Sequence, residues 1–380
     1  MRFKKYCQNL DWWLIFAVIA ACVFGIIVIG SATHINLGES KSTYYSQMVW
    51  FTVGLIIMFI MSRINLELLS NITLPIYIFN IVLLLAVLVM GSSAKGATRW
   101  LALGPIRIQP SEFTKIFMIF CLAKLIDKNR TEINNKNVLL KIFIYVAVPL
   151  VLIERQPSLS ASLVLLVILV TELFCAGISY KYIVRGLMIV IPIVVFVMFD
   201  VTREHHIIIN KVLSDYQISR LATFINPVQG SDAYYQTLKS ISAIGSGQFM
   251  GKGLYQGTLN QLSYLPEPHN DFIFSVIGEE FGFVGCITVL ALLFFILFRC
   301  VLIAMSCRNS FLQLVVAGIV GMFAFQTFVN TGVATGILPN TGMSLPFVGY
   351  GGSSMWTNMA AIGIVLNVGL KRSRSLFEEV

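Results

Sequence analysis

Long uninterrupted runs of apolar residues recur along this 380-residue chain, and they constrain its fold more than any other feature. The first run, WWLIFAVIAACVFGIIVIGS, covers residues 12–31. A helix needs about 20 such residues to cross the apolar core of a bilayer. Hydrophobic residues make up 57% of the chain and charged residues only 12%, which excludes a soluble globular domain. We therefore expect an integral membrane protein that crosses the bilayer many times.

Ten membrane-spanning helices are predicted, and each is bounded by charged residues, glycine or proline. They cover residues 12–31, 46–63, 72–90, 111–127, 138–153, 159–178, 182–200, 270–298, 310–337 and 345–370. The predicted fold class is thus an all-α polytopic membrane protein, with residues 1–380 in a single integral-membrane domain. Pro149 and Pro192 fall inside two spans, where neighbouring helices can satisfy the carbonyls that proline leaves unpaired. The first span lacks the small-residue cleavage pattern of a signal peptide, so we expect a permanent helix.

Basic residues set the predicted orientation, because cytoplasmic loops retain an excess of Lys and Arg. A cytoplasmic N-terminus places most of the 27 basic residues on that side. Both termini are then cytoplasmic, and one long loop, residues 201–269, lies outside. The net charge of +9 follows from this retention, so we expect anionic lipid headgroups, and no nucleic acid, as partners of these residues.

The seven cysteines fall in predicted spans or on the cytoplasmic side, and none falls in the long external loop. This distribution argues against a disulfide scaffold. Cysteine and histidine also lack the spacings of metal ligands.

Residues 91–111, GSSAKGATRWLALGPIRIQPS, form a short external segment that carries Lys95, Arg99 and Arg107 but no acid. A short loop with three cations should resist export, so we expect the external side to need this charge. Arginine suits phosphate because its planar fork donates two parallel hydrogen bonds. Phosphate binding is one interpretation, and anchoring to lipid headgroups is the other.

Glu112 and Lys115 follow directly in QPSEFTK, and their spacing of three residues puts them on one face of a helix. Ionisable residues within a span usually face the bundle interior or a water-filled cavity and mark a functional path. An ion pair that only fixes the helix register is the alternative interpretation.

The long external loop contains two further patterns. Residues 207–225 mix Ile, Leu and Phe with charged residues at helical spacing, which predicts an amphipathic helix on the outer membrane surface. Residues 243–253, AIGSGQFMGKG, suggest a phosphate-binding P-loop that would use Lys252. That match fails, because the glycine spacing is one residue too long and Gly253 stands where Ser or Thr is required. Two interpretations of this segment stay open: a mobile turn, and glycines that let backbone amides approach a phosphate outside the membrane.

Asp271 lies in LPEPHNDFIFSVIGEE, residues 265–280, at the predicted external entrance of the eighth span. The free N–H groups of the first helical turn favour a carboxylate there, so N-capping is the simplest interpretation. Four other ionisable groups share this segment: Glu267, His269, Glu279 and Glu280. Carboxylates placed so deep in a span favour a functional interpretation.

Residues 330–354, NTGVATGILPNTGMSLPFVGYGGSS, join the last two spans through a predicted external loop. Pro339 and Pro346 stop helices, and the glycines allow close backbone packing. The neutral polar groups of this loop suit binding better than acid–base chemistry, and a tight re-entrant loop is the alternative.

These motifs together resemble the SEDS family (shape, elongation, division and sporulation), which includes RodA and FtsW. The resemblance covers nearly the whole chain and rests on DWWLIF, GATRWLALGPIRIQPSEFTK, ERQPSLSASL, AIGSGQFMGKG, YLPEPHNDFIFSVIGEEFGFVG and NTGVATGILPNTGMSLPFVGYGGSS. It implies a peptidoglycan glycosyltransferase that polymerises lipid II on the outer face of the bacterial cytoplasmic membrane. It also implies a class B penicillin-binding protein as partner, within a complex of other elongation or division membrane proteins.

The resemblance also assigns residues. It makes Asp271 the essential catalytic carboxylate. The residues expected to bind the substrate are Arg99, Arg107, Glu112, Lys115, Lys252 and His269. DWW and GKGLYQGTLNQLSYLPE look more like the RodA branch than the FtsW branch. The family's usual acid and glycine are replaced by Ser158 and Ser160 in QPSLSA, which puts a role for that loop in doubt.

As a hypothesis, Asp271 removes the proton of an acceptor hydroxyl that attacks the anomeric carbon of a lipid diphosphate donor, with inversion. Arg99, Arg107 and Lys115 would stabilise the diphosphate charge. A divalent cation such as Mg or Mn could assist them, and no organic cofactor is expected. A flippase for the same lipid is the rival function, since intramembrane charges and broken helices also describe transporters. A non-catalytic scaffold is the third.

Overall fold

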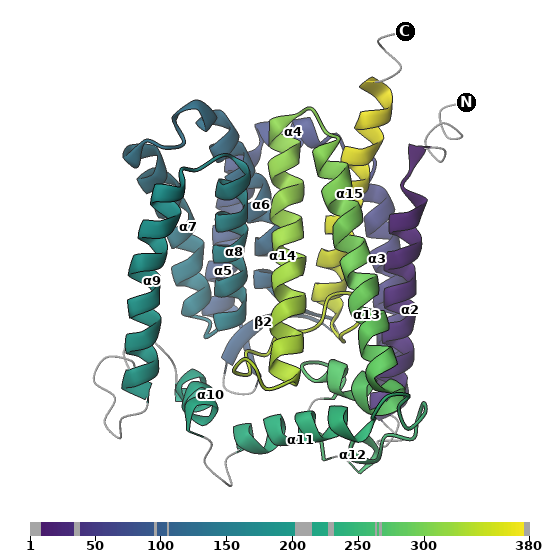
Figure 1. Cartoon of the computed structure of the whole chain (residues 1–380). Coiled ribbons are helices and arrows are strands. Elements are labelled where there is room, and N and C mark those ends of the chain that lie inside the picture. Colours follow the sequence, from purple (N-terminus) through teal and green to yellow (C-terminus); the bar gives the residue numbers. More distant parts are fainter. Residues whose placement is uncertain are drawn as a thin grey trace.

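A computed structural model describes residues 9–33, 39–94, 97–104, 106–201, 215–226, 232–262, 264–265 and 268–375. The described part of the chain is a bundle of long helices with small elements at both ends (Figure 1). The bundle helices are α2 (Trp12–Ala32), α3 (Glu39–Met61), α5 (Thr73–Met90), α6 (Pro110–Lys128), α7 (Lys136–Glu154), α8 (Leu159–Cys175), α9 (Tyr180–Val201), α13 (Ile273–Met305), α14 (Ser310–Ala334) and α15 (Gly352–Ser375). Helix α2 begins and α15 ends at the same end of the bundle.

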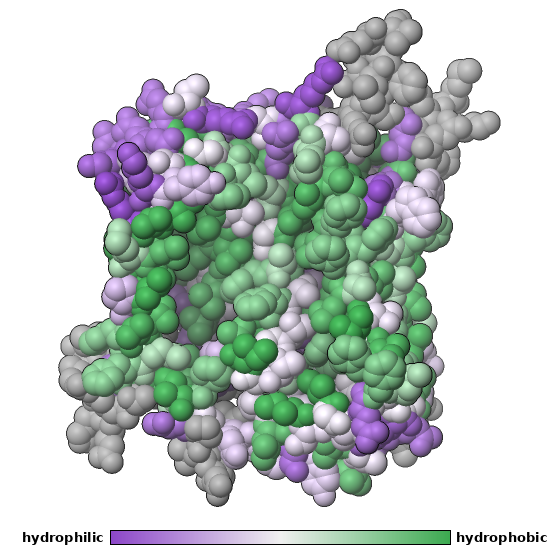
Figure 2. All heavy atoms as spheres, viewed as in Figure 1, coloured by the Kyte–Doolittle hydropathy of each residue, from purple (hydrophilic) through white to green (hydrophobic). Residues whose placement is uncertain are grey.

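Each predicted span corresponds to one of these helices, so the polytopic all-α fold class is confirmed. Within the described residues, seven helices are long and apolar enough to cross a membrane, and α8 is a shorter apolar helix of 17 residues. Figure 2 shows apolar side chains across the middle of the bundle, with hydrophilic residues gathered near the end that carries α4 (Leu66–Asn71). Pro149 and Pro192 lie inside α7 and α9, as expected.

Three boundaries differ from the prediction by seven residues. Helix α3 begins at Glu39 instead of residue 46. Helix α13 extends to Met305 instead of ending near residue 298, because apolar residues continue to that point. Helix α15 begins at Gly352 rather than residue 345, because Pro346 and the glycines that follow it keep residues 341–351 out of a helix. These non-helical residues form a loop, called the 341–351 loop below, at the end of the bundle opposite the start of α2.

Helix α14 occupies the centre of the bundle and packs against α6, α8 and α13. Of its most apolar 18-residue window, 61% is buried, whereas none of the corresponding window of α9 is buried. Helix α9 therefore stands at the edge of the bundle (Figure 1). The described cysteines are all free thiols, which agrees with the expectation of no disulfide scaffold.

A layer of short elements covers the end of the bundle opposite the termini (Figure 1). It contains α10 (Asp215–Ile225), α11 (Asp232–Ser246) and α12 (Thr258–Gln261), together with an antiparallel sheet of β1 (Ser92–Ala94), β2 (Ala97–Leu103) and β3 (Ile106–Ile108) in the order β1-β2-β3. The other end carries α4 and a 3₁₀ turn at Arg130–Glu132.

The predicted amphipathic helix 207–225 is described from residue 215 onward as α10, and residues 207–214 lie outside the described residues. One face of α10 packs against the end of α9 through Ile218 and Val201. The cationic segment 91–111 folds as the small sheet, which the sequence did not predict.

Helix α13 is broken at Gly282, whose φ of 65° and ψ of −160° are not helical. The break frees backbone groups, and residues 248–253 satisfy them. The amides of Lys252 and Gly253 donate to the carbonyls of residues 279 and 280 at 3.0 and 2.9 Å, and the amides of residues 283 and 284 donate back to residues 248 and 249. The glycine-rich segment is therefore a backbone partner of a broken helix, and it satisfies N–H and C=O groups that the break leaves unpaired.

Candidate active site

Asp271 lies in the turn that precedes α13 and is partly exposed. Its backbone carbonyl accepts a hydrogen bond of 3.0 Å from Nδ2 of Asn330, on α14. The same Nδ2 donates to the carbonyl of Met343 at 2.7 Å. One buried amide thus joins the Asp271 turn, α14 and the 341–351 loop.

His269 also belongs to this turn and contacts the same loop. Its carbonyl accepts a 3.0 Å hydrogen bond from the amide of Tyr350, and the two rings meet edge to face with centroids 5.2 Å apart. Burial raises the pKa of the Tyr350 phenol, so it keeps its proton at neutral pH. Gln47 of α3 holds the other side of the loop through the carbonyl of Gly349 and the amide of Gly351.

Arg220 reaches the same place from α10. Its Nη1 lies 3.4 Å, and Oδ2 of Asp271 lies 3.6 Å, from the position that a Cβ of residue 342 would take. Gly342 itself has a φ of 71°, which disfavours any side chain. A guanidinium and the Asp271 carboxylate therefore border one small space beside Gly342.

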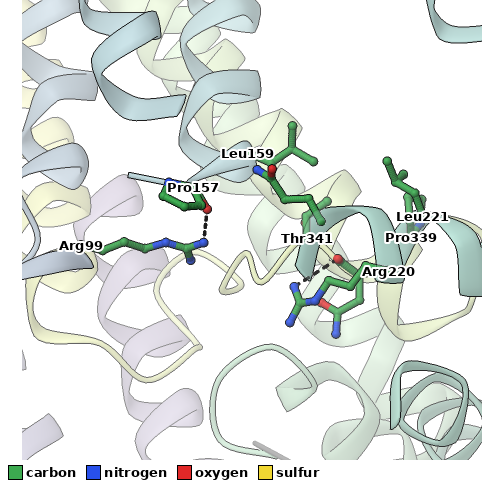
Figure 3. Close-up of a pocket in the computed structure, with 9 residues that line it drawn as sticks. Arg99, Pro157, Leu159, Arg220, Leu221, Pro339 and Thr341 are labelled. Atoms are coloured by element: carbon green, nitrogen blue, oxygen red, sulfur yellow. Dashed lines mark hydrogen bonds between the residues drawn. The ribbon is translucent and has the colours of Figure 1, made fainter. Parts of the chain in front are cut away.

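Arg220 also lines a small pocket, together with Arg99, Asn340 and Thr341, the residue before Gly342. Figure 3 shows Arg99 of β2 and Arg220 of α10 extending toward each other across it. Arg99 donates to the carbonyls of Gln156 and Pro157, and Arg220 donates to the carbonyl of Asn340 at 3.1 Å. Two guanidinium groups therefore line one pocket, and guanidinium groups are well suited to bind an anion such as phosphate.

Glu112 and Lys115 form the predicted pair one helical turn inside α6. Nζ of Lys115 lies 2.7 Å from Oε2 of Glu112, and the two side chains are 2% and 17% exposed. The start of α6 is tied to the start of α15 by the amide of Gln109, which donates to Oγ of Ser353 at 3.0 Å. The pair therefore lies in the bundle interior, behind the external layer.

Two predicted substrate ligands are placed differently from Arg99. Arg107 lies on β3 with its side chain exposed. Lys252 forms an ion pair of 2.8 Å with Glu279, and Glu279 also accepts from the Thr258 hydroxyl and from the amides of residues 259 and 260. The structure thus gives Lys252 a partner of its own on α13, and its role as a substrate ligand stays a prediction.

Lys95 and Glu267 lie outside the described residues. Glu280 accepts a hydrogen bond from the Ser31 hydroxyl on α2, so the two adjacent carboxylates of α13 serve different neighbours. Both link α13 to other elements of the external end.

A divalent cation is one group that the sequence leaves open for this site. The described residues contain no group of three His, Cys, Asp or Glu side chains that could hold a metal ion. A divalent cation at this site stays a prediction.

Sequence reasoning missed Arg220 and Asn330. Arg220 was assigned to an amphipathic helix, although a cation that interrupts its apolar pattern was visible in QISRLATFI. Asn330 begins the NTGVATG motif and was treated only as a neutral polar residue. Its burial, 0% exposed, is a tertiary fact that no local pattern carries.

Comparisons with known proteins agree in one family. A family model described as "Cell cycle protein", which spans FtsW, RodA and SpoVE, matches residues 12–374. The chain is 35% identical over 371 residues to a probable peptidoglycan glycosyltransferase FtsW of Trichlorobacter lovleyi, covering 95% of this chain and 94% of the relative. It is 33% identical over 361 residues to the peptidoglycan glycosyltransferase MrdB of Escherichia coli, covering 95% and 93%.

Solved structures give the same result. A chain from a structure on coordination of polymerization and crosslinking by a peptidoglycan synthase complex superposes with a TM-score of 0.80 at 29% identity, covering 96% of this chain and 98% of that chain. The rod shape determining protein RodA of Thermus thermophilus superposes with a TM-score of 0.69 at 28% identity, covering 96% and 97%.

Proposed function

Since the chain belongs to the FtsW, RodA and SpoVE family and is a peptidoglycan glycosyltransferase, we propose that it polymerises lipid II into glycan strands on the outer face of the bacterial cytoplasmic membrane. One observation supports this most directly. The Asp271 carboxylate borders the same small space as Arg220, and Arg220 lines a pocket together with Arg99. A base beside an anion-binding pocket suits transfer of a sugar away from a lipid diphosphate.

In the proposed mechanism, Asp271 accepts the proton of a hydroxyl on the acceptor sugar. The hydroxyl oxygen forms a bond to the anomeric carbon of the donor, and the bond from that carbon to the diphosphate oxygen breaks with inversion. The lipid diphosphate leaves with the electron pair. A well-placed general base contributes a factor of about 10²–10⁴. No second carboxylic acid is required, because diphosphate leaves without protonation, unlike the alcohol of a glycoside.

Arg99 and Arg220 would bind the diphosphate. Guanidinium groups donate bidentate hydrogen bonds to phosphate oxygens, and these bonds strengthen as negative charge grows on the leaving group. Both side chains line the same pocket, and each is oriented by backbone carbonyls of neighbouring segments.

We propose a RodA-like role in cell elongation, on the strength of the DWW and GKGLYQGTLNQLSYLPE stretches. A septal, FtsW-like role is the second candidate, because a relative named FtsW is 35% identical over 95% of the chain. Complementation separates them. Restored rod shape in cells that lack their elongation polymerase supports the first role, and restored septation in cells that lack their division polymerase supports the second.

A class B penicillin-binding protein is the proposed partner. A peptidoglycan synthase complex that coordinates polymerization and crosslinking contains the structural relative with a TM-score of 0.80. Co-purification with a class B penicillin-binding protein of the same cell supports the pairing, and failure to co-purify counts against it.

The direct test incubates the purified protein with labelled lipid II, with and without a class B penicillin-binding protein, and resolves glycan strands by electrophoresis. We expect polymer from the unchanged protein and none from Asp271→Asn, which keeps the size of the side chain but accepts no proton. Polymer from Asp271→Asn would refute the base assignment. Movement of lipid II across vesicles without polymer would favour a flippase.

A further inference from the structure

We infer that Asn330 is a positioning residue for this reaction, because its side-chain amide fixes the backbone of Asp271 against the 341–351 loop. The inference rests on the proposed function, in which Asp271 is the base. Asn330 lies on α14, and the whole of α13 separates it in sequence from the Asp271 turn, yet its side chain contacts the backbone of that turn.

The geometry selects this role. Asn330 is completely buried, and its Nδ2 donates to the carbonyl of Asp271 at 3.0 Å and to that of Met343 at 2.7 Å. An amide nitrogen has two N–H groups, so both are engaged by carbonyls of segments that are far apart in the chain. The Asp271 turn and the 341–351 loop are thereby held at a fixed separation.

The bonding is selective as well. Oδ1 of Asn330 is buried and has no hydrogen-bond partner among the described residues. A half-satisfied buried amide stabilises a fold poorly, because an unpaired polar atom costs about 1–3 kcal/mol. The two engaged N–H groups, and not overall stability, are therefore the reason for an amide here.

The consequence for the chemistry follows from where the turn leads. Oδ2 of Asp271 lies 3.6 Å from the Cβ position of residue 342, and Gly342 belongs to the same loop that Asn330 holds. Loss of the amide would remove the bond at Asp271 itself and leave the His269–Tyr350 contact to link the turn to the loop, so the carboxylate could move relative to the acceptor hydroxyl. A misplacement of about 1 Å reduces turnover by about 100-fold.

The chain offers a matched control in Asn367 of α15. Its Nδ2 also donates to two backbone carbonyls, those of Met61 and Ile64 at 3.0 and 2.6 Å, and it is 5% exposed. These bonds lie at the opposite end of the bundle, away from Asp271. Asn→Asp at either position places a carboxyl oxygen against two carbonyls, so the local chemical change is the same.

The experiment compares Asn330→Asp and Asn330→Ser with Asn367→Asp and Asn367→Ser in purified, folded protein. For the Asn330 variants we expect kcat to fall about 10- to 100-fold while KM for lipid II changes less than about threefold. For the Asn367 variants we expect lower thermal stability with kcat retained. Equal losses of kcat at the two positions would overturn the inference, and Asn330→Ser decides if Asn330→Asp does not fold.

A second readout does not depend on activity. Asp271→Cys is introduced into the otherwise unchanged protein, into Asn330→Ser and into Asn367→Ser, and its rate of labelling by a membrane-impermeant thiol reagent is measured. Labelling of the native cysteines is measured in the same proteins without Asp271→Cys and subtracted. We expect the labelling rate at position 271 to change more than about threefold with Asn330→Ser and to stay unchanged with Asn367→Ser. An unchanged rate with Asn330→Ser would overturn the inference, whereas a wild-type protein that makes no polymer would overturn only the proposed function.

Discussion

The Glu112–Lys115 pair allows a quantitative prediction, because its two charges are buried unequally. The Lys115 side chain is 2% exposed, and that of Glu112 is 17% exposed. Glu112→Gln leaves an ammonium inside the bundle with no counter-charge at 2.7 Å. Lys115→Met leaves a carboxylate that still reaches water. We therefore expect Glu112→Gln to destabilise the protein more than Lys115→Met does.

The magnitude follows from the contact distance. Two unit charges 2.7 Å apart attract by roughly 6 kcal/mol at an effective dielectric constant of about 20. Desolvation of both groups offsets part of this attraction, and removal of one partner from a buried pair typically costs about 3–5 kcal/mol. We expect Glu112→Gln at the upper end of that range and Lys115→Met at or below its lower end. The double variant should recover most of the loss, because it removes both buried charges.

Thermal unfolding of the four proteins in the same lipid nanodiscs measures this double-mutant cycle. A coupling of about 2 kcal/mol or more is expected for a buried contact pair. Additive losses, or a larger loss from Lys115→Met than from Glu112→Gln, would refute the reasoning. In the polymerisation assay, activity restored by the charge-swapped pair Glu112→Lys and Lys115→Glu would make the pair structural, and activity that stays lost would indicate a direct role.

Three further substitutions test separate features. Gly282→Ala should lower the melting temperature by the equivalent of about 1–3 kcal/mol, because residue 282 has a backbone conformation that essentially only glycine adopts, and an unchanged melting temperature would contradict the break in α13. Glu172→Met should raise the melting temperature. Glu172 is 0% exposed and neither carboxyl oxygen has a hydrogen-bond partner among the described residues, and an unpaired buried group costs about 1–3 kcal/mol. A lower melting temperature would mean that Glu172 makes a stabilising contact in the protein. Arg220→Leu should raise KM for lipid II about tenfold or more, with Arg220→Lys intermediate, and an unchanged KM would remove Arg220 from the diphosphate site.

Helix positions could be predicted because each span must be continuously apolar, and that property is local. The ends of α2 and α5 were accordingly predicted within one residue. The start of α15 was not, since apolar residues continue through Leu345 and Phe347, although Pro346 lies between them. Hydropathy alone does not distinguish a buried loop from a buried helix.

In the candidate site, contacts within one helix could be predicted and contacts between elements could not. Glu112 and Lys115 were paired from their spacing, because a helix brings residues three apart together. Arg220 reaches the Asp271 turn only through tertiary packing of α10, so its position relative to Asp271 was not predictable from its own neighbourhood. Lys252 illustrates another tertiary contact that the sequence did not predict, since its ammonium contacts Glu279 on a different element, and its role as a substrate ligand stays a prediction.

The break at Gly282 has a consequence for how the protein is made. Residues 248–253, which complete the hydrogen bonds of the broken α13, are synthesised immediately before that helix. The backbone groups that pair with the interruption therefore precede it in synthesis, and we expect them to satisfy its free N–H and C=O groups as the segment enters the lipid. Biosynthesis from the N-terminus suits this order, and a rearranged gene that delivered the interrupted segment first would be expected to burden the insertion machinery.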